Sequence, residues 1–145
     1  MAQLGFEVCN NATEDLKEKA IAVFGEGYGY KGKTADVDIY IDAAGADSIL
    51  DFYQENGKVD SRMVIVAVGS NSRQVDILGM TFGQLAIIGS GGYAPENVDD
   101  VMRIMESGRW KIESIITDEY PWEQLLEAIE KATNVNESLN VIIRY

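Results

Sequence analysis

Residues 27–34 combine glycine, lysine and threonine in a spacing that could bind phosphate. Their sequence, Gly-Tyr-Gly-Tyr-Lys-Gly-Lys-Thr, satisfies the pattern G-x-x-x-x-G-K-[ST]. In such a loop Lys33 would reach the β- and γ-phosphates of a nucleotide, and the hydroxyl of Thr34 would hold Mg²⁺. Gly27, Gly29 and Gly32 also satisfy G-x-G-x-x-G, the fingerprint of a dinucleotide-binding turn. Nucleotide binding is therefore the first chemistry that these residue types suggest.

The surroundings of residues 27–34 do not fit either motif. Both motifs follow a strand and open a helix, because the helix N-terminus supplies amide groups to the phosphate. Here a predicted helix precedes the segment, and a β-branched strand begins two or three residues after Thr34. We therefore expect a flexible, glycine-rich connection at residues 25–34. A stand-alone α/β domain that binds a nucleotide or a protein partner through residues 27–34 is the alternative function.

Three apolar segments that each stop at glycine form a second candidate for ligand binding. They cover residues 37–45, 63–70 and 85–92. Continuous β-branched runs are typical of strands that are buried on both faces of a parallel sheet. In open α/β sheets, ligands bind just outside the carboxyl ends of the strands. Small residues at these ends would let a flat ligand approach the backbone closely.

Few other residues have the pattern of a catalytic group. Asp42 ends a predicted strand, where its carboxylate could contact a ribose or accept hydrogen bonds from loop amides, and we favour the amides. Cys9, the only cysteine, has no basic neighbour in sequence, so a core position is favoured over a nucleophile. The sequence has no histidine. A Ser-His-Asp triad and a zinc site built from the usual nitrogen and sulfur ligands are therefore excluded within this chain.

The composition is that of one acidic globular domain. The 145 residues carry a formal net charge of −12, and 46% of them are hydrophobic. The negative charge argues against nucleic-acid binding, because basic patches normally supply affinity for the phosphate backbone. No apolar run approaches the roughly 20 residues of a membrane span, and the first residues show no signal peptide. We therefore expect a cytoplasmic protein without a membrane partner.

Apolar periodicity and stop signals predict strands that alternate with helices. The predicted strands are residues 6–9, 37–42, 63–68, 85–88 and 139–144, with a short edge strand or turn at 75–78 and an extended segment at 112–116. The predicted helices follow an N-cap at Thr13, cover 47–56, run from Pro95 to before Gly108, and begin at Pro121. This alternation indicates βαβ units. We predict an α/β fold with a Rossmann-like, mostly parallel sheet and flanking helices.

The order and spacing of several short stretches resemble the zinc-dependent medium-chain alcohol dehydrogenase superfamily, near its sorbitol and threonine dehydrogenase branch. Residues 35–39 and 42–45, Ala-Asp-Val-Asp-Ile and Asp-Ala-Ala-Gly, are similar to the family's Ala-Asp-Val-Val-Ile and Glu-Cys-Ser-Gly. Residues 4–6 resemble its Leu-Gly-Ala, and residues 88–90 resemble its Gly-Ser segment before a long helix. Residues 116–121, Ile-Thr-Asp-Glu-Tyr-Pro, resemble its Ile-Thr-His-Arg-Phe-Pro.

This resemblance implies an NAD(P)-dependent oxidoreductase that acts on alcohols or polyols. Residues 1–145 would form part of its NAD(P)-binding domain. In the family, the backbone after the fifth strand holds the nicotinamide carboxamide, the turn after the sixth strand lines the nicotinamide, and the turn after the fourth strand touches the ribose. The cofactor-binding residues that this implies are Ala44, Gly45, Val68, Gly69, Ser70, Ser90, Gly91 and Gly92.

The resemblance also implies parts that lie outside this sequence. The family's first βαβ unit, with its phosphate-binding turn, and its catalytic domain, with the zinc ligands, would come before Met1. We therefore expect a C-terminal nucleotide-binding portion that takes NAD or NADP and has no catalytic or metal-binding residues of its own. We expect this portion to be inactive alone, with zinc bound only in the catalytic domain.

The absence of the first two strands would expose an apolar edge at residues 37–42. We expect residues 6–9 to pair onto this edge, or another chain to cover it. In the family the sixth-strand region pairs with a second subunit, so residues 75–88 are a candidate dimer edge. The expected partners are therefore a nicotinamide dinucleotide and further copies of the same chain.

Overall fold

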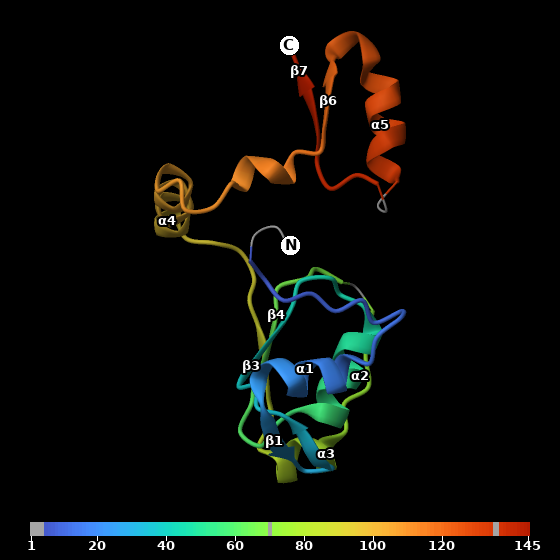
Figure 1. Cartoon of the computed structure of the whole chain (residues 1–145), viewed down its shortest axis with the longest axis vertical. Coiled ribbons are helices and arrows are strands. Elements are labelled where there is room, and N and C mark those ends of the chain that lie inside the picture. Colours follow the sequence, from blue (N-terminus) through green and yellow to red (C-terminus); the bar gives the residue numbers. More distant parts are fainter. Residues whose placement is uncertain (1–4, 70, 135–136) are drawn as a thin grey trace. The chain divides into compact units, whose positions relative to one another are not determined.

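The computed structural model describes residues 5–69, 71–134 and 137–145. It divides into two compact units, Met1–Gly92 and Tyr93–Tyr145 (Figure 1). The first unit contains all the residues of the predicted ligand edge. Among the described residues, no helix is long and apolar enough to cross a membrane.

The centre of the first unit is a parallel sheet of three strands. They are β3 (Ile39–Asp42), β4 (Arg62–Ile65) and β5 (Ala86–Gly89), in the order β3-β4-β5. Each of the three segments that stop at glycine therefore contributes one strand, and both neighbouring pairs are parallel as predicted. The α/β, Rossmann-like fold class is confirmed by this sheet and its flanking helices.

Helix α2 (Asp47–Asn56) packs onto the sheet and forms the core with it. It has the bounds that the sequence predicted, and Gly57 caps its C-terminus. Leu50 and Tyr53 on α2 are buried together with Met63 on β4. The Tyr53 hydroxyl also lies 2.8 and 3.1 Å from the carbonyl oxygens of Ser61 and Ala86, which share the hydrogen bond that it donates. One side chain thus anchors the helix to the starts of two strands.

The N-cap of helix α1 (Leu16–Phe24) is Asp15 and not Thr13, the N-cap that the sequence predicted. The Asp15 carboxylate accepts a hydrogen bond from the Glu18 amide at 2.9 Å, which satisfies one of the free donors of the first turn. The Thr13 amide instead donates to the Asn10 carbonyl at 3.0 Å within a turn. Thr13 and Asp15 both have a side-chain oxygen that could cap this helix, and the turn at residues 10–13 decided between them.

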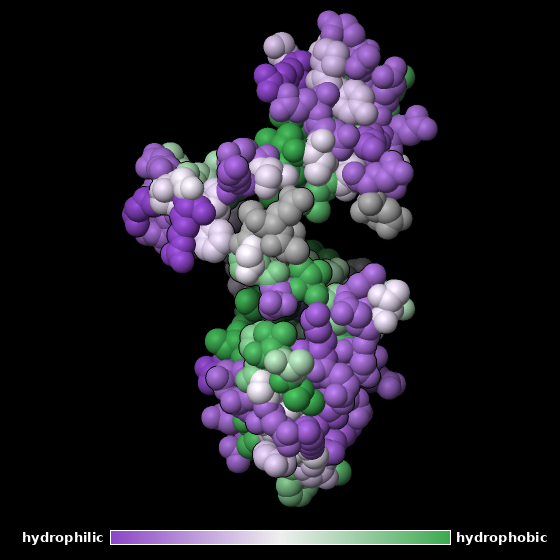
Figure 2. Space-filling model, viewed as in Figure 1, coloured by the Kyte–Doolittle hydropathy of each residue, from purple (hydrophilic) through white to green (hydrophobic). Residues whose placement is uncertain are grey.

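The predicted strand at residues 6–9 is wrong, because this segment has no strand assignment in the structure. Its predicted pairing with residues 37–42 is therefore also wrong. In the part of the chain that the structure describes, the only strand neighbour of β3 is β4. Ile39 and Ile41 on β3 are 57% and 66% exposed, and Figure 2 shows hydrophobic surface on the first unit. Alternating apolar residues were not enough to make a strand at residues 6–9.

Residues 25–34 form a β-hairpin, which corrects the prediction of a flexible connection. Strands β1 (Glu26–Gly29) and β2 (Gly32–Ala35) pair antiparallel, with Tyr28 opposite Lys33. The ring of Tyr30, at the turn, stacks on Phe82 with the ring centroids 5.3 Å apart. These pairing and stacking contacts hold the glycine-rich segment in place, and neither could be read from its local composition.

Helix α3 (Ile77–Gly83) replaces the edge strand or turn that was predicted at residues 75–78. The Asp76 carboxylate accepts a hydrogen bond from the Gly79 amide at 3.0 Å, which caps the helix. The helix ends at Gln84, which adopts the left-handed conformation with φ 50°. Helix α3 occupies half of residues 75–88, so β5 is the only strand within the candidate dimer edge among the described residues.

The second unit contains a βαβ arrangement after a separate helix. Helix α4 (Pro95–Glu106) begins at Pro95 as predicted. Strands β6 (Asp118–Pro121) and β7 (Val141–Arg144) pair parallel and are connected through η3 (Trp122–Gln124) and α5 (Leu125–Thr133). The last strand thus lies inside the predicted range 139–144.

Two predictions in the second unit need correction. The extended segment at 112–116 contains instead the 3₁₀ helix η2 (Ile112–Ile115), closed by a hydrogen bond from the Ile116 amide to the Glu113 carbonyl at 3.1 Å. Pro121 ends β6, so the α-helix begins only at Leu125, after η3. A proline fits the end of this strand as well as the first turn of a helix, because neither place requires its amide hydrogen.

Candidate functional site

The parallel strands of the first unit bring the predicted turns to one edge of the sheet. Two amides after β4, those of Val66 and Ala67, donate to the Asp42 carbonyl at the end of β3, at 2.9 and 3.0 Å. The Ser90 amide after β5 donates to the Ile65 carbonyl at the end of β4, at 2.9 Å. The strand ends are therefore tied side by side. The predicted site residues that follow them are Ala44, Gly45, Val68, Gly69, Ser90, Gly91 and Gly92, while Ser70 lies outside the described residues.

The glycines of this edge leave the backbone accessible. No other atom lies within 4 Å of the positions that a Cβ would take at Gly89, Gly91 and Gly92. The side chain of Val68 in the neighbouring turn is fully exposed. The backbone around these glycines has the open shape that a flat ring could contact, so the residues present fit the nicotinamide end of a dinucleotide.

Gly45 occupies a position where only glycine fits without strain. Its φ is +76°, in the left-handed region, and a Cβ there would lie 3.2 Å from the Cβ of Ala67. The turn after β3 therefore approaches the turn after β4 closely. This explains why the first of the three segments stops at glycine.

Asp42 organises the turn after β3 from inside the protein. Its side chain is fully buried, and Oδ1 accepts hydrogen bonds from the amides of Ala44 and Gly45 at 3.0 and 2.7 Å. The interpretation of Asp42 as an acceptor of loop amides is thus confirmed. The Gly45 amide lowers the pKa of this carboxyl, helped by the Ala44 amide and the Arg73 guanidinium, against burial, which raises it.

Arg73 is a residue of this edge that the sequence analysis missed. Its Nη1 lies 3.4 Å from Asp42 Oδ2 and its Nε lies 3.0 Å from Asp47 Oδ1. Its Nη2 also donates a hydrogen bond to the Gly45 carbonyl oxygen. One signal was present in the sequence, since Arg73 is the only lysine or arginine between Arg62 and Arg103.

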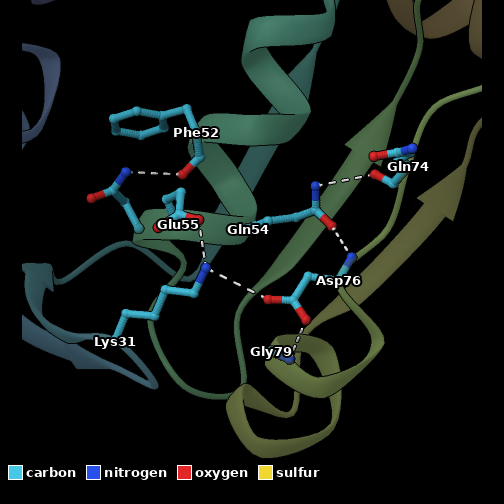
Figure 3. Close-up of polar contacts among 8 residues, drawn as sticks. Lys31, Phe52, Gln54, Glu55, Gln74, Asp76 and Gly79 are labelled. Carbon is cyan, nitrogen blue, oxygen red and sulfur yellow. Dashed lines mark hydrogen bonds and ion pairs between the residues drawn. The ribbon is translucent and has the colours of Figure 1, made fainter.

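The hairpin lysines that suggested a phosphate-binding loop are both held in ion pairs, and Figure 3 shows those of Lys31. Lys33 Nζ lies 2.7 Å from Glu26 Oε2 within the hairpin. Lys31 Nζ lies 2.5 Å from Glu55 Oε1 on α2 and 3.5 Å from Asp76 Oδ2 at the start of α3. The carboxylates of Glu55 and Glu26 raise the pKa of Lys31 and Lys33, respectively.

The geometry of residues 27–34 contradicts the phosphate-loop alternative. The Thr34 side chain is buried, and its hydroxyl donates to the Asn56 carbonyl oxygen. The segment leads from one strand into another and is not followed by a helix, so no helix N-terminus faces it. The hairpin is instead a structural element that Lys31, Gln54 and Asp76 join to α2 and α3 (Figure 3).

A separate groove of about 770 Å³ lies between α1, α2 and β3. Most of its lining is apolar, including Leu16, Phe52 and Ile41. Asp15, one of its charged residues, is engaged in capping α1. The groove does not contain the turns at the carboxyl ends of the strands. It is therefore distinct from the candidate ligand edge.

The described residues offer no arrangement suited to zinc. None of their histidine, cysteine, aspartate and glutamate side chains gather in a group of three or more that could hold a metal ion.

A three-stranded parallel sheet with open glycine turns at its carboxyl edge defines the class as a Rossmann-like fold. Several solved structures of similar fold are alcohol dehydrogenases or other dehydrogenases. One is the alcohol dehydrogenase TADH from Thermus sp. ATN1, with a TM-score of 0.81 and 20% identity, covering 99% of this chain and 39% of that one. No protein-family model and no curated protein sequence matches the chain.

Two other similar structures contain a nicotinamide cofactor. A short chain alcohol dehydrogenase from E. coli CFT073, complexed with NADH, has a TM-score of 0.73 and 23% identity, covering 94% of this chain and 38% of that one. A putative zinc-binding dehydrogenase from Sinorhizobium meliloti 1021, bound to NADP, has a TM-score of 0.64 and 18% identity, covering 75% and 32%. At these identities the likeness shows the shared fold. The chain spans less than two fifths of the length of each of these enzymes.

Proposed function

We propose that the chain is the nucleotide-binding portion of an alcohol or polyol dehydrogenase of the medium-chain, zinc-binding type. The observation that carries this proposal is the set of glycine turns that the three parallel strands align at one edge, with open backbone at Gly89, Gly91 and Gly92. The dehydrogenase structures of the same fold, with bound NADH and NADP, support it. Residues 1–145 would then form part of one cofactor domain.

In this proposal the chain orients the nicotinamide half of NAD or NADP. The backbone of Val68, Gly69 and Ser70 holds the carboxamide, and the turn containing Ser90, Gly91 and Gly92 lines the ring. Ala44 and Gly45 contact the ribose. The bound cofactor supplies the hydride chemistry, and these residues supply its position. The open backbone at Gly91 and Gly92 suits that task.

Nuclear magnetic resonance with the ¹⁵N-labelled chain tests the proposal. Adding NADH or NADPH should shift the amide signals of residues 44–45, 68–69 and 90–92, whereas Mg-ATP should leave residues 27–34 unchanged. Gly91→Val should weaken NADH binding, because its side chain fills the open space without meeting another atom of the protein. Ala132→Val, at an exposed position of α5, is the matched control. The proposal fails if NADH and NADPH shift no signal at the three turns.

We also propose that the chain associates with copies of itself. The exposed apolar side chains of Ile39 and Ile41 on the edge strand β3 support this, because unpaired apolar edges favour association. Sedimentation over a range of concentrations checks it, and a monomer at every concentration would contradict it.

A further inference from the structure

We propose that Arg73 is a positioning residue for the nicotinamide half of the dinucleotide. The inference rests on the proposed function and adds a residue that the family resemblance did not supply. Arg73 belongs to the segment after β4, while the groups it binds belong to the end of β3 and the start of α2. It therefore joins the two turns that would hold the carboxamide and the ribose.

A single guanidinium makes three different contacts at this edge. Nη1 faces the buried carboxylate of Asp42, Nη2 binds the carbonyl oxygen of Gly45, and Nε faces the exposed carboxylate of Asp47. Its Nη2 also lies 3.8 and 3.9 Å from the positions that a Cβ would take at Gly45 and Gly69. The side chain is only 18% exposed. The guanidinium is therefore adjacent to both glycine turns.

These contacts fix the two peptide groups on either side of the Gly45 Cα. The Asp42 carboxylate accepts a hydrogen bond from the Gly45 amide, and the Arg73 guanidinium donates a hydrogen bond to the Gly45 carbonyl oxygen. Glycine in the left-handed region has many alternative conformations, so without these bonds the turn would sample several of them. A turn that is already ordered loses less entropy when a ligand binds, which favours affinity.

Arginine is required because of its shape as well as its charge. The planar guanidinium presents five donors in a fixed fork, whereas the lysine ammonium is a compact point charge. A lysine at position 73 could approach Asp42 but could not bind Asp42, Gly45 and Asp47 at the same time. Arg73→Lys therefore keeps the charge and removes the simultaneous contacts.

The test compares Arg73→Lys with the control Arg62→Lys, which lies at the start of β4, away from the carboxyl edge. Reduced nicotinamide mononucleotide is added to the ¹⁵N-labelled full chain, and amide shifts give the dissociation constant. We expect about a tenfold weaker affinity for Arg73→Lys, because ligand binding must then also order the turn, at a cost of about 1.4 kcal/mol, and no change for Arg62→Lys. The ligand-induced shifts at residues 44–45 should be lost, while those at 90–92 should persist at higher ligand concentration.

Three other outcomes would contradict either the role of Arg73 or the proposed function. Unchanged affinity in Arg73→Lys would overturn the role of Arg73 and leave the proposed function intact. A proportional loss of all ligand shifts, together with a lower thermal midpoint, would show that Arg73 is merely structural. No binding to the wild-type chain would overturn both proposals. If Arg73→Lys does not fold, Asp47→Asn removes only the exposed contact and should weaken binding about threefold, the effect of an exposed ion pair.

Discussion

Replacement of Asp42 by asparagine tests the electrostatic design of the strand-end turn most directly. Asparagine has the same shape and keeps an oxygen for the amides of Ala44 and Gly45. It replaces the Oδ2 atom that faces Arg73 Nη1 at 3.4 Å with a donor group. A hydrogen bond to a charged group contributes about 1.5–3 kcal/mol, and the long distance places this one in the lower half. We expect Asp42→Asn to lower the free energy of unfolding by about 2 kcal/mol.

Asp42→Ala should lower the free energy of unfolding more than Asp42→Asn does, because it also removes the acceptor of the hydrogen bonds from two amides. An amide left without a partner away from water costs about 1–3 kcal/mol, so we expect a total loss of about 4 kcal/mol. Both losses are measurable against the roughly 5–15 kcal/mol of a typical domain. Urea unfolding should be followed by the amide signals of residues 5–92, since Trp110 and Trp122 both lie in the second unit.

The pH dependence of this difference gives a second, independent check. The pKa of Asp42 is lowered in the folded chain, so its charge stabilises the fold above the unfolded pKa of about 3.9. The difference between wild type and Asp42→Asn should be constant from about pH 5 to 8 and disappear as the pH falls through the folded pKa. A difference that is absent at pH 7, or that persists unchanged in acid, would refute the reasoning.

Two further substitutions test the turn and the core. Gly45→Ala should lower the free energy of unfolding by about 2 kcal/mol, because alanine is strained at φ +76° and its Cβ would lie 3.2 Å from that of Ala67. Gly91→Ala, at a position with open space around it, should leave the free energy of unfolding nearly unchanged. Equal effects of the two substitutions in urea unfolding would contradict this prediction. Tyr53→Phe should cost about 1 kcal/mol through loss of the bonds to Ser61 and Ala86, and Tyr40→Phe less, since its hydroxyl lies 3.4 Å from its acceptor. Thermal unfolding measures the stability of both tyrosine variants. A larger loss of stability for Tyr40→Phe than for Tyr53→Phe would contradict the prediction that the Tyr53 hydroxyl contributes more.

Much of the first unit's sheet could be predicted from local sequence. Continuous apolar runs that stop at glycine identified the three parallel strands, because such runs are typical of parallel sheets, although Ile39 and Ile41 on β3 are exposed. Helices α2 and α4 were predicted equally well, since Gly57 and Pro95 give clear stop and start signals. The turns that follow these strands were predicted to meet at one edge, and they do.

Short segments without a strong period were predicted poorly. Residues 25–34 are a hairpin and residues 77–83 are a helix, although their composition suggested a loop and an edge strand. In both cases contacts distant in sequence decide the outcome, such as Tyr30 on Phe82 and Lys31 with Glu55. A local pattern cannot encode such contacts, because it does not specify which distant residue will be the partner.

The sequence by itself determined the three parallel strands, helices α2 and α4, the glycine turns and the role of Asp42 as an acceptor of loop amides. It also presented a phosphate-loop pattern that the tertiary structure contradicts, because Lys33 pairs with Glu26 and Thr34 is buried. Only the tertiary structure placed Arg73 against Asp42 and Gly45, which precede it by about thirty residues. The physical reason is that a turn at a sheet edge is completed by side chains from the neighbouring strand's turn, and strand pairing brings these together.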